Sequence, residues 1–289
     1  MLKFAKYQGT GNDFIIFEID EVKELEYSKL AKSVCNRHFG IGADGMIVVA
    51  PSNNASIQMI FYNADGTRAT MCGNGIRCFA KYVYDHRLVE RDTFTVETLA
   101  GILTVEVLHH NDFESLVKIN MGTPQYTHET IPTPVLGDTF INQILTIDEG
   151  EYIVSSLFMG TIHTILFVDN INEKEAIRLG KAIEHHIIYP QKTNVNFCKV
   201  IDSKNIEVLT LEKGVGLTLA CGTGSAACAH LSQKLYHCED ELRVHTKGGT
   251  LLMTKQDDGL YMTFWGLYSG AKKRTGHHPV RACSADSCN

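Results

Sequence analysis

Short apolar segments rich in β-branched residues alternate with glycine-containing turns along most of the chain. Such segments are typical of β-strands, and the clearest cover residues 13–18, 45–49, 57–62, 94–96, 103–107, 164–168 and 195–200. Stretches with helical spacing of apolar positions are fewer and cover residues 27–36, 75–86, 171–186 and 224–236. The pattern predicts an α+β fold in which mostly antiparallel strands surround a central helix in each half of the chain.

The two halves of the chain repeat each other at an offset of 148 or 149 residues. The four-residue pattern C-G-x-G begins at Cys72 and again at Cys221, each time before a stretch that predicts a helix. Further residues agree at an offset of 148, namely Phe94, Val96, Thr98, Gly101 and Leu103 with Leu242, Val244, Thr246, Gly249 and Leu251. Internal repeats indicate a duplicated unit, so we expect two similar domains related by a pseudo-twofold axis.

The boundary between the two domains is expected in residues 122–134, where three prolines and a glycine turn interrupt the strand pattern. The first domain is predicted to cover residues 1–123 and the second 124–266. The C-terminal segment 267–289 is expected to return to the first domain. Its composition from residue 271 onward, with clustered basic residues, is typical of a loosely ordered tail.

Length and composition restrict the class of protein. At 289 residues with 44% apolar content, the chain is long enough for two domains with sizeable cores. The net charge of −6, with acidic and basic residues interspersed, argues against a nucleic-acid partner. No apolar run approaches the roughly 18 residues that span a membrane, and the first residues lack the apolar core of a signal peptide. We therefore expect a cytoplasmic protein.

The nine cysteines are an odd, unevenly spaced set, which is typical of free thiols in a reducing compartment. Cys72 and Cys221 stand out because each is expected at a helix N-terminus, where unpaired N–H groups and the helix dipole favour the thiolate. The same N–H groups can hold a carboxylate or a developing oxyanion, and the glycines let the backbone approach a ligand closely. The repeat therefore predicts two equivalent thiols on opposite walls of one cleft.

Two thiols that face one carbon can invert its configuration. A thiolate on one face removes a proton while a thiol on the other face supplies one, which is the chemistry of a two-base racemase. A redox pair, a zinc site and purely structural thiols are the alternatives. A redox pair is usually a C-x-x-C motif, which the chain lacks, and His38, His163 and His230 have no recognisable zinc-ligand spacing. We expect no metal and no other cofactor.

The ordered motifs of the chain resemble those of the diaminopimelate epimerases. The resemblance extends from Lys6 to about Thr263 and includes, besides the two cysteine motifs, GTGNDF at 9–14, GIGADG at 40–45, NADG at 63–66, TNV at 193–195 and EKG at 212–214. Several motifs in one order are far more specific than any one of them. The resemblance implies an enzyme that needs no pyridoxal phosphate, with two similar α/β domains and a catalytic cysteine from each.

The resemblance also implies a role for each matching residue, with Cys72 and Cys221 as the acid/base pair. The implied substrate-binding residues are Asn12, Asn63 and Asn194 in the pocket, Gly73, Asn74, Gly222 and Thr223 around the reacting carboxylate, and His163 and Glu212 beside the reacting centre. Without the family pattern, the three asparagines would be interpreted as turn residues and the histidine as a buried core residue.

Two positions depart from the family pattern. The chain has Thr161 where the family usually has asparagine, and Lys213 where it usually has arginine. In the family, both residues help to bind the distal amino-acid end of diaminopimelate. Lysine lacks the planar fork that grips a carboxylate, and threonine cannot present an amide. A lost polar partner costs about 1–3 kcal/mol, which is enough to change the preferred substrate.

We therefore predict a cofactor-independent racemase or epimerase that inverts the α-carbon of a free amino acid other than diaminopimelate, such as histidine, with Thr161 and Lys213 among its substrate-binding residues. Diaminopimelate epimerase, which converts the LL form to the meso form for lysine and cell-wall synthesis, is the alternative, because the three pocket asparagines are retained. A non-catalytic amino-acid-binding protein is the alternative of another class. The expected partners are a small-molecule amino acid and, as a candidate, a second copy of the chain in a homodimer.

Overall fold

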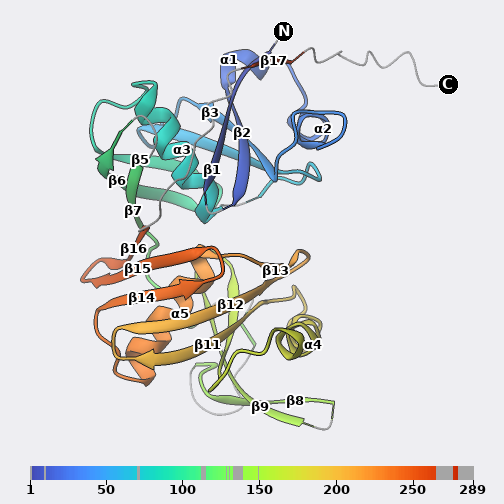
Figure 1. Ribbon diagram of the computed structural model, residues 1–289, viewed down its shortest axis with the longest axis vertical. Helices are drawn as coiled ribbons and strands as arrows, with labels where there is room; N and C mark the ends of the chain where they lie inside the picture. Colours follow the sequence, from blue (N-terminus) through green and yellow to red (C-terminus); the bar gives the residue numbers. More distant parts are fainter. Residues whose placement is uncertain are drawn as a thin grey trace, which may run out of the picture. The chain divides into compact units, whose positions relative to one another are not determined.

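The computed structural model describes residues 2–9, 11–69, 72–111, 115–127, 129, 131–132, 139–148 and 150–264, and the backbone of 276–278 (Figure 1). The internal contacts divide the chain into two compact units. The first unit holds the described residues up to Ile102 together with 276–278, and the second holds Leu103–Asn111 and the described residues from Ser115 to Phe264. The predicted boundary after residue 123 lies in the turn that follows β7 (Ser115–Asn120) and stays a prediction.

The first unit begins with two paired strands and carries its longest helix near its end. It contains β1 Leu2–Gly9, β2 Asn12–Glu18, α1 Ile19–Val22, α2 Tyr27–Cys35, β3 Gly45–Ala50, β4 Ile57–Asn63, α3 Gly73–Asp85, β5 Thr93–Thr98 and β17 Gly276–His278. β1 pairs antiparallel with β2 and with β17, β2 runs parallel to β3, β3 pairs antiparallel with β4, and β4 runs parallel to β5. The other residues of the predicted returning segment 267–289 lie outside the described residues.

The second unit repeats this order. It contains most of β6 Gly101–His110, β7, β8 Gln143–Ile147, β9 Gly150–Phe158, β10 Ile162–Phe167, α4 Glu173–Glu184, β11 Asn194–Asp202, β12 Asn205–Glu212, β13 Gly216–Thr218, α5 Gly222–Leu235, β14 Glu241–Thr246, β15 Gly249–Gln256 and β16 Gly259–Phe264. β9 pairs antiparallel with β10, β10 runs parallel to β11, β11 pairs antiparallel with β12, and β12 runs parallel to β14. Antiparallel pairs then link β14, β15, β16, β7 and β6.

The strand registers give a residue-by-residue equivalence between the units, because the same positions face each other across neighbouring strands. At an offset of 149 residues, Phe14, Gly45, Ile47 and Phe61 in the first unit correspond to His163, Asn194, Asn196 and Thr210 in the second. The repeat seen in the sequence is therefore a repeat of strand pairing. The predicted α+β class with two repeated halves is confirmed.

A helix packs on each face of the strands in both units. The central helices are α3, which contacts β1, β2 and β3, and α5, which contacts β10, β11 and β12 and the strands β14 to β16. A second apolar cluster in the first unit joins α1 and α2 to β2 and β3 through residues such as Leu30, Val34, Phe17 and Val48. Its counterpart in the second unit joins α4 to β11 and β12. The central helix predicted in each half is present.

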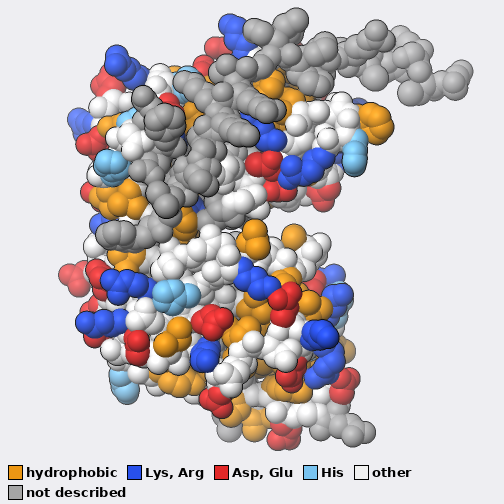
Figure 2. Space-filling view, viewed as in Figure 1, with side chains coloured by type: hydrophobic (Ala, Val, Ile, Leu, Met, Phe, Trp, Pro, Cys, Tyr) orange, Lys and Arg blue, Asp and Glu red, His pale blue; other side chains and the backbone are white. Residues whose placement is uncertain are grey.

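The visible surface carries mixed charge, as the composition suggested. Figure 2 shows Lys and Arg side chains interspersed with Asp and Glu on the face in view. Within the residues that the structure describes, no helix is long enough and apolar enough to cross a membrane.

Candidate active site

In the first unit, the candidate residues gather at one end of the sheet. β2 begins at Asn12, β4 ends at Asn63, and the strand between them, β3, begins at Gly45 directly opposite Asn63. The Asn63 side-chain amide donates to Thr67 Oγ1 at 2.9 Å, inside the turn that leads away from β4. The structure thus places the two predicted pocket asparagines of this unit, Asn12 and Asn63, at the same end of neighbouring strands.

Cys72 is the N-cap residue of α3. Its backbone is extended, with φ −137° and ψ 119°, and its Sγ accepts the Gly75 N–H at 3.4 Å. A Cβ at Gly75 would be crowded, because it would lie 3.3 Å from both Cys72 Cβ and Met59 Cε. Gly73 and Asn74 begin the first turn of α3, where N–H groups point out of the helix end. The sequence predicted a helix N-terminus at Cys72, and the structure confirms it.

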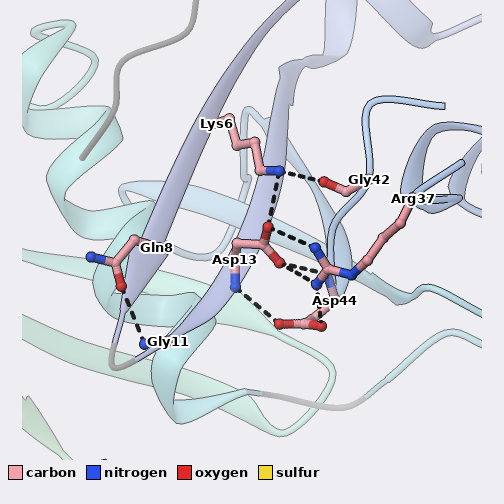
Figure 3. Close-up of polar contacts among 7 residues, drawn as sticks. All are labelled: Lys6, Gln8, Gly11, Asp13, Arg37, Gly42 and Asp44. Atoms are coloured by element: carbon pink, nitrogen blue, oxygen red, sulfur yellow. Dashed lines mark hydrogen bonds and ion pairs between the residues drawn. The ribbon is translucent and has the colours of Figure 1, made fainter. Parts of the chain in front are cut away.

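Next to Asn12, four charged side chains form what we call the ion cluster, made of Lys6, Asp13, Arg37 and Asp44 (Figure 3). Arg37 grips the Asp13 carboxylate with both terminal nitrogens, at 2.8 and 3.2 Å, and also reaches Asp44 at 2.7 Å. Lys6 Nζ lies 2.9 Å from the same Asp13 carboxylate and donates to the Gly42 carbonyl. The cluster ties the start of β2 to the loop that precedes β3.

The ion cluster keeps Asp13 ionised. Burial alone would favour the neutral acid, but the hydrogen bonds from Arg37 and Lys6 outweigh it and lower the Asp13 pKa to about 2. The main chain adds to this link, because the Asp13 N–H donates to Asp44 Oδ2 at 3.1 Å. Asp13, which follows Asn12 in the chain, therefore stays charged over the ordinary pH range.

In the second unit, Cys221 is the N-cap residue of α5 and is 8% exposed. Its Sγ lies 3.4 Å from Thr223 Oγ1, and Asn74 occupies the position equivalent to Thr223 in the first unit. Glu212, the last residue of β12, lies beside the same thiol. Burial raises the Glu212 pKa, and the neighbouring Thr218 and Cys221 side chains oppose that shift. A carboxyl group and a thiol thus meet at this helix end.

The turn Glu212–Lys213–Gly214 is held by its backbone. The Lys213 N–H donates to Asn194 Oδ1 at 2.9 Å, and the Gly214 N–H donates to Glu184 Oε1 at 3.0 Å. Asn194 also donates its amide to the Ile162 carbonyl at 3.3 Å, directly after Thr161. The Asn194 amide therefore joins the turn to the start of β10, and Lys213 is left with an exposed side chain.

His163 is completely buried at the start of β10. Its Nδ1 lies 3.1 Å from Asn196 Nδ2, and Asn196 Oδ1 accepts the Thr210 hydroxyl at 2.9 Å. We call these three residues the imidazole triad. Burial lowers the His163 pKa to about 3, against an opposing contribution from the hydrogen bond with Asn196 and with a smaller lowering by the charge on Lys213, so the ring is neutral at physiological pH.

Sequence reasoning missed Asn196, Thr210, Glu184 and the ion cluster. The repeat carried a signal for the first two, because Asn196 and Thr210 are polar where the other half has Ile47 and Phe61. Glu184 and the ion cluster join segments far apart in the chain, and no local motif marks such pairs.

The remaining described cysteines are buried. Burial raises the pKa of Cys35 and of Cys78 to about 12, and it also raises the pKa of Cys228 and Cys238. None of the seven cysteines in the described part of the chain forms a disulfide. Among those same residues, no group of three or more His, Cys, Asp or Glu side chains could hold a metal ion.

Comparison with known proteins gives concordant matches. The sequence pattern of the family described as diaminopimelate epimerase matches residues 4–127 and 155–264. A diaminopimelate epimerase from Caldanaerobacter subterraneus subsp. tengcongensis is 46% identical over 263 residues, which are 91% of this chain and 95% of the relative. A diaminopimelate epimerase from Alkaliphilus metalliredigens is 44% identical over 90% of this chain and 93% of its own.

Solved structures share the fold at low sequence identity. A hydroxyproline epimerase from Agrobacterium vitis has a TM-score of 0.65 at 14% identity and covers 91% of this chain and 88% of its own. A phenazine biosynthesis protein of the PhzF family from Bacillus anthracis has a TM-score of 0.63 at 19% identity, with 90% and 93% coverage. Together with the sequence matches, these findings show that the chain belongs to the diaminopimelate epimerase family and is an isomerase of the amino-acid racemase and epimerase type.

Proposed function

We propose that the chain is a diaminopimelate epimerase that inverts one α-carbon with Cys72 and Cys221 as its acid/base pair. The observation that carries the proposal is the match to the Caldanaerobacter enzyme, at 46% identity over 91% of this chain. Cys72 and Cys221 are the N-cap residues of α3 and α5, so each unit offers one thiol at a helix N-terminus for this chemistry. The substrate and the pairing of the two thiols are the parts that experiment has to test.

The proposed step moves two protons and no electrons. One cysteine thiolate takes the α-proton, and the carbanion takes a proton from the other cysteine thiol on the opposite face. In the reverse direction the two cysteines exchange roles. Glu212 lies beside Cys221 with a raised pKa, so its carboxyl group is suited to accept the proton of that thiol and to return it.

The helix ends can hold the charge that develops in this step. Gly73 and Asn74 begin α3, and Gly222 and Thr223 begin α5, where N–H groups point out of the helix end. N–H groups at a helix start bind a carboxylate and stabilise an oxyanion. We assign the α-carboxylate of the substrate to them, and Asn12, Asn63 and Asn194 to the walls of the pocket.

The substrate assignment follows the relatives rather than the two sequence departures. Thr161 and Lys213 predicted a different amino acid such as histidine, whereas the curated relatives carry the name diaminopimelate epimerase and support the alternative. The anchored backbone of Lys213 and its exposed side chain suit a cation offered to a distal carboxylate. Histidine racemisation has no support from a specific contact.

Side-by-side kinetics test the proposal. The purified chain, dialysed and without added pyridoxal phosphate, is assayed for kcat/KM with LL-diaminopimelate and with L-histidine, by chiral chromatography. We expect diaminopimelate to be preferred by at least about 100-fold, the size that two matched polar contacts supply. A preference for histidine would overturn the substrate while leaving the reaction type in place.

A variant pair sharpens the result. Lys213→Arg and Thr161→Asn restore the residues usual in the family, and each should lower KM for diaminopimelate modestly with little change in kcat. Glu151→Gln, on β9 and away from both positions, serves as the charge control and should change neither constant. No gain from Lys213→Arg would mean that this side chain does not meet the distal carboxylate.

Homodimer formation and a cytoplasmic location stay predictions from the sequence.

A further inference from the structure

The imidazole triad is a buried polar island at a place where the repeat is apolar. Its three counterparts in the first unit are Phe14, Ile47 and Phe61, which we call the apolar triad. Phe14 and Phe61 pack edge to face with ring centroids 5.9 Å apart. The fold therefore forms the same strand pairing without any polar group at these positions, and the imidazole triad is not a requirement of the fold.

Hydrogen bonds orient the Asn196 amide in one way. Its Oδ1 accepts the Thr210 hydroxyl at 2.9 Å, and its Nδ2 lies 3.3 Å from the Thr164 carbonyl and 3.5 Å from the Asn194 carbonyl. A reversed amide would place its oxygen against two carbonyl oxygens. The group that reaches His163 Nδ1 at 3.1 Å is thus an N–H donor.

The ring proton of His163 must then sit on the other nitrogen. Because Nδ1 accepts from Asn196, a neutral imidazole carries its hydrogen on Nε2. Nε2 is fully buried and has no hydrogen-bond partner among the described residues. Buried donors are rarely left without a partner in native proteins, so this N–H at the start of β10 is available to an acceptor that the described residues of the second unit do not supply.

The triad is also built into the helix that carries Cys221. A Cβ on Gly224, in the first turn of α5, would lie 2.3 Å from Asn196 Oδ1 and 3.2 Å from Thr210 Oγ1. The helix can therefore seat on the strands only with glycine at this position. Asn196 touches the histidine through its nitrogen and the first turn of α5 through its oxygen side.

We propose that Asn196 is a positioning residue that fixes His163 as the neutral tautomer with its proton on Nε2, so that His163 presents this single buried N–H at the reacting centre. The tautomer follows from contacts within the second unit and does not depend on the proposed function. The use of the N–H at the reacting centre rests on the proposed function. A deprotonated Nδ1 also means that His163 acts here as a hydrogen-bond donor rather than as a cation.

Nitrogen NMR of the full chain tests the tautomer directly. Protein labelled with 15N-histidine is recorded at pH 7, and the His163 signals are identified by their loss in His163→Gln. We expect one unprotonated nitrogen, Nδ1, and one protonated nitrogen, Nε2. A protonated Nδ1, or a ring protonated at both nitrogens, would overturn the proposal whatever the substrate proves to be.

Two variants separate positioning from folding. Asn196→Leu keeps the size but removes the donor, so the His163 ring should become a mixture of both tautomers. Asn196→Asp offers only an acceptor, so the proton should move to Nδ1. We expect kcat with diaminopimelate to fall roughly 10- to 100-fold in both, the range seen when a residue that orients a functional histidine is lost. A single Nε2–H tautomer together with unchanged kcat in both variants would overturn the role of Asn196.

Ser156→Ala is the matched control. Ser156 is as buried as Asn196 and also bonds to two side chains, Thr164 and Tyr189, but it does not touch His163. It should lower thermal stability while leaving the His163 tautomer and kcat unchanged. Addition of an equilibrium mixture of the diaminopimelate isomers should then shift the wild-type Nε2 signal. A tautomer as proposed with no such shift would mean that the bound amino acid does not reach Nε2, and would leave the positioning role of Asn196.

Discussion

The two units share one strand pairing but carry different polar groups at equivalent positions. On the face toward the central helix, the second unit has the imidazole triad where the first has the apolar triad. Toward the strand ends, the first unit has the ion cluster. At the positions of Lys6 and Asp44 the second unit has Ser156 and Thr193, which belong to a buried hydroxyl cluster with Thr164 and Tyr189. The shared fold accepts charged, hydroxyl or apolar residues at equivalent positions.

This difference separates what the fold needs from what the site needs. A buried polar group with partners adds little net stability, whereas one without a partner costs about 1–3 kcal/mol. The hydroxyl cluster and the ion cluster satisfy their members, so either can serve the fold. The imidazole triad leaves His163 Nε2 without a partner in the described chain, and such a cost is typical of residues kept for a ligand.

The largest effect is expected at the N-cap cysteine of the central helix, which both units have. Cys72→Ala or Cys221→Ala should each lower kcat by about 10²–10⁴-fold in both reaction directions, because the proposed mechanism uses each thiol as the base in one direction and as the acid in the other. Chiral chromatography measures the loss. In deuterated water the wild-type product should carry deuterium early, while recovered substrate stays protonated.

Other cysteines provide the control for this effect. Cys35→Ala and Cys238→Ala remove buried thiols whose pKa is raised by burial, and both should keep nearly full kcat. Survival of more than a tenth of the activity in either Cys72→Ala or Cys221→Ala would contradict a two-thiol mechanism. Early deuterium in unreacted substrate would point instead to a single base.

Placing the asparagine of the imidazole triad at the equivalent position of the first unit should destabilise that unit. Ile47→Asn places an amide, completely buried, between Phe14 and Phe61, which offer it no hydrogen bond. We expect the free energy of unfolding to fall by about 3 kcal/mol. Urea denaturation gives the value, and hydrogen exchange of the β3 amides assigns it to the first unit.

Ile47→Val is the matched control, since it removes one methylene and adds no polar group. It should cost about 0.5–1.5 kcal/mol. An Ile47→Asn variant no less stable than Ile47→Val would mean that the first unit can satisfy an amide here. The contrast between the two triads would then say nothing about function.

Much of the fold could be predicted from the sequence, because the repeat and the strand periodicity are local or regular signals. The predicted helix at 75–86 is α3, Gly73–Asp85, and the strand at 57–62 is β4, Ile57–Asn63. β1 was missed because Lys3 and Lys6 interrupt its apolar alternation, and their charges are compensated only by distant partners such as Asp13. β8 and β9 follow a stretch in which prolines hid the strand pattern.

The candidate site was predictable where family motifs mark it and not where it depends on contacts across the fold. The helix ends behind Cys72 and Cys221 followed from the glycine pattern. The hydrogen bonds of the Asn194 side chain to Ile162 and Lys213 could not be predicted from the sequence, because they depend on the pairing of β10 with β11. The imidazole triad was visible only as a difference between the two halves, which needs the register of both.

Breaking the ion cluster should give a smaller effect that depends on pH. The Asp13 pKa is about 2 in the folded chain against 3.8 for an ordinary aspartate. A lowered folded pKa contributes stability above the unfolded value and loses it as pH falls through the folded value. Asp13→Asn should therefore cost about 2 kcal/mol at pH 7, and its difference from wild type should shrink between pH 4 and about 2.

Urea denaturation at several pH values follows this change. Asp20→Asn, whose side chain is 89% exposed, is the control and should stay within about 0.5 kcal/mol of wild type throughout. A pH-independent loss in Asp13→Asn would mean that packing, rather than the charge held by Arg37 and Lys6, accounts for the contribution of Asp13.

The hydroxyl cluster should give the smallest effect, because its bonds are between neutral groups. Tyr189→Phe removes the hydroxyl that lies 2.8 Å from Ser156 Oγ, while Ser156 keeps its 3.0 Å contact with Thr164. No buried group is left unpaired, so we expect a loss of about 1 kcal/mol. A double-mutant cycle with Ser156→Ala should show a positive coupling of similar size. Zero coupling would mean that the second unit gains nothing from this pair, and the hydroxyl cluster could not be the counterpart of the ion cluster in holding its strand ends.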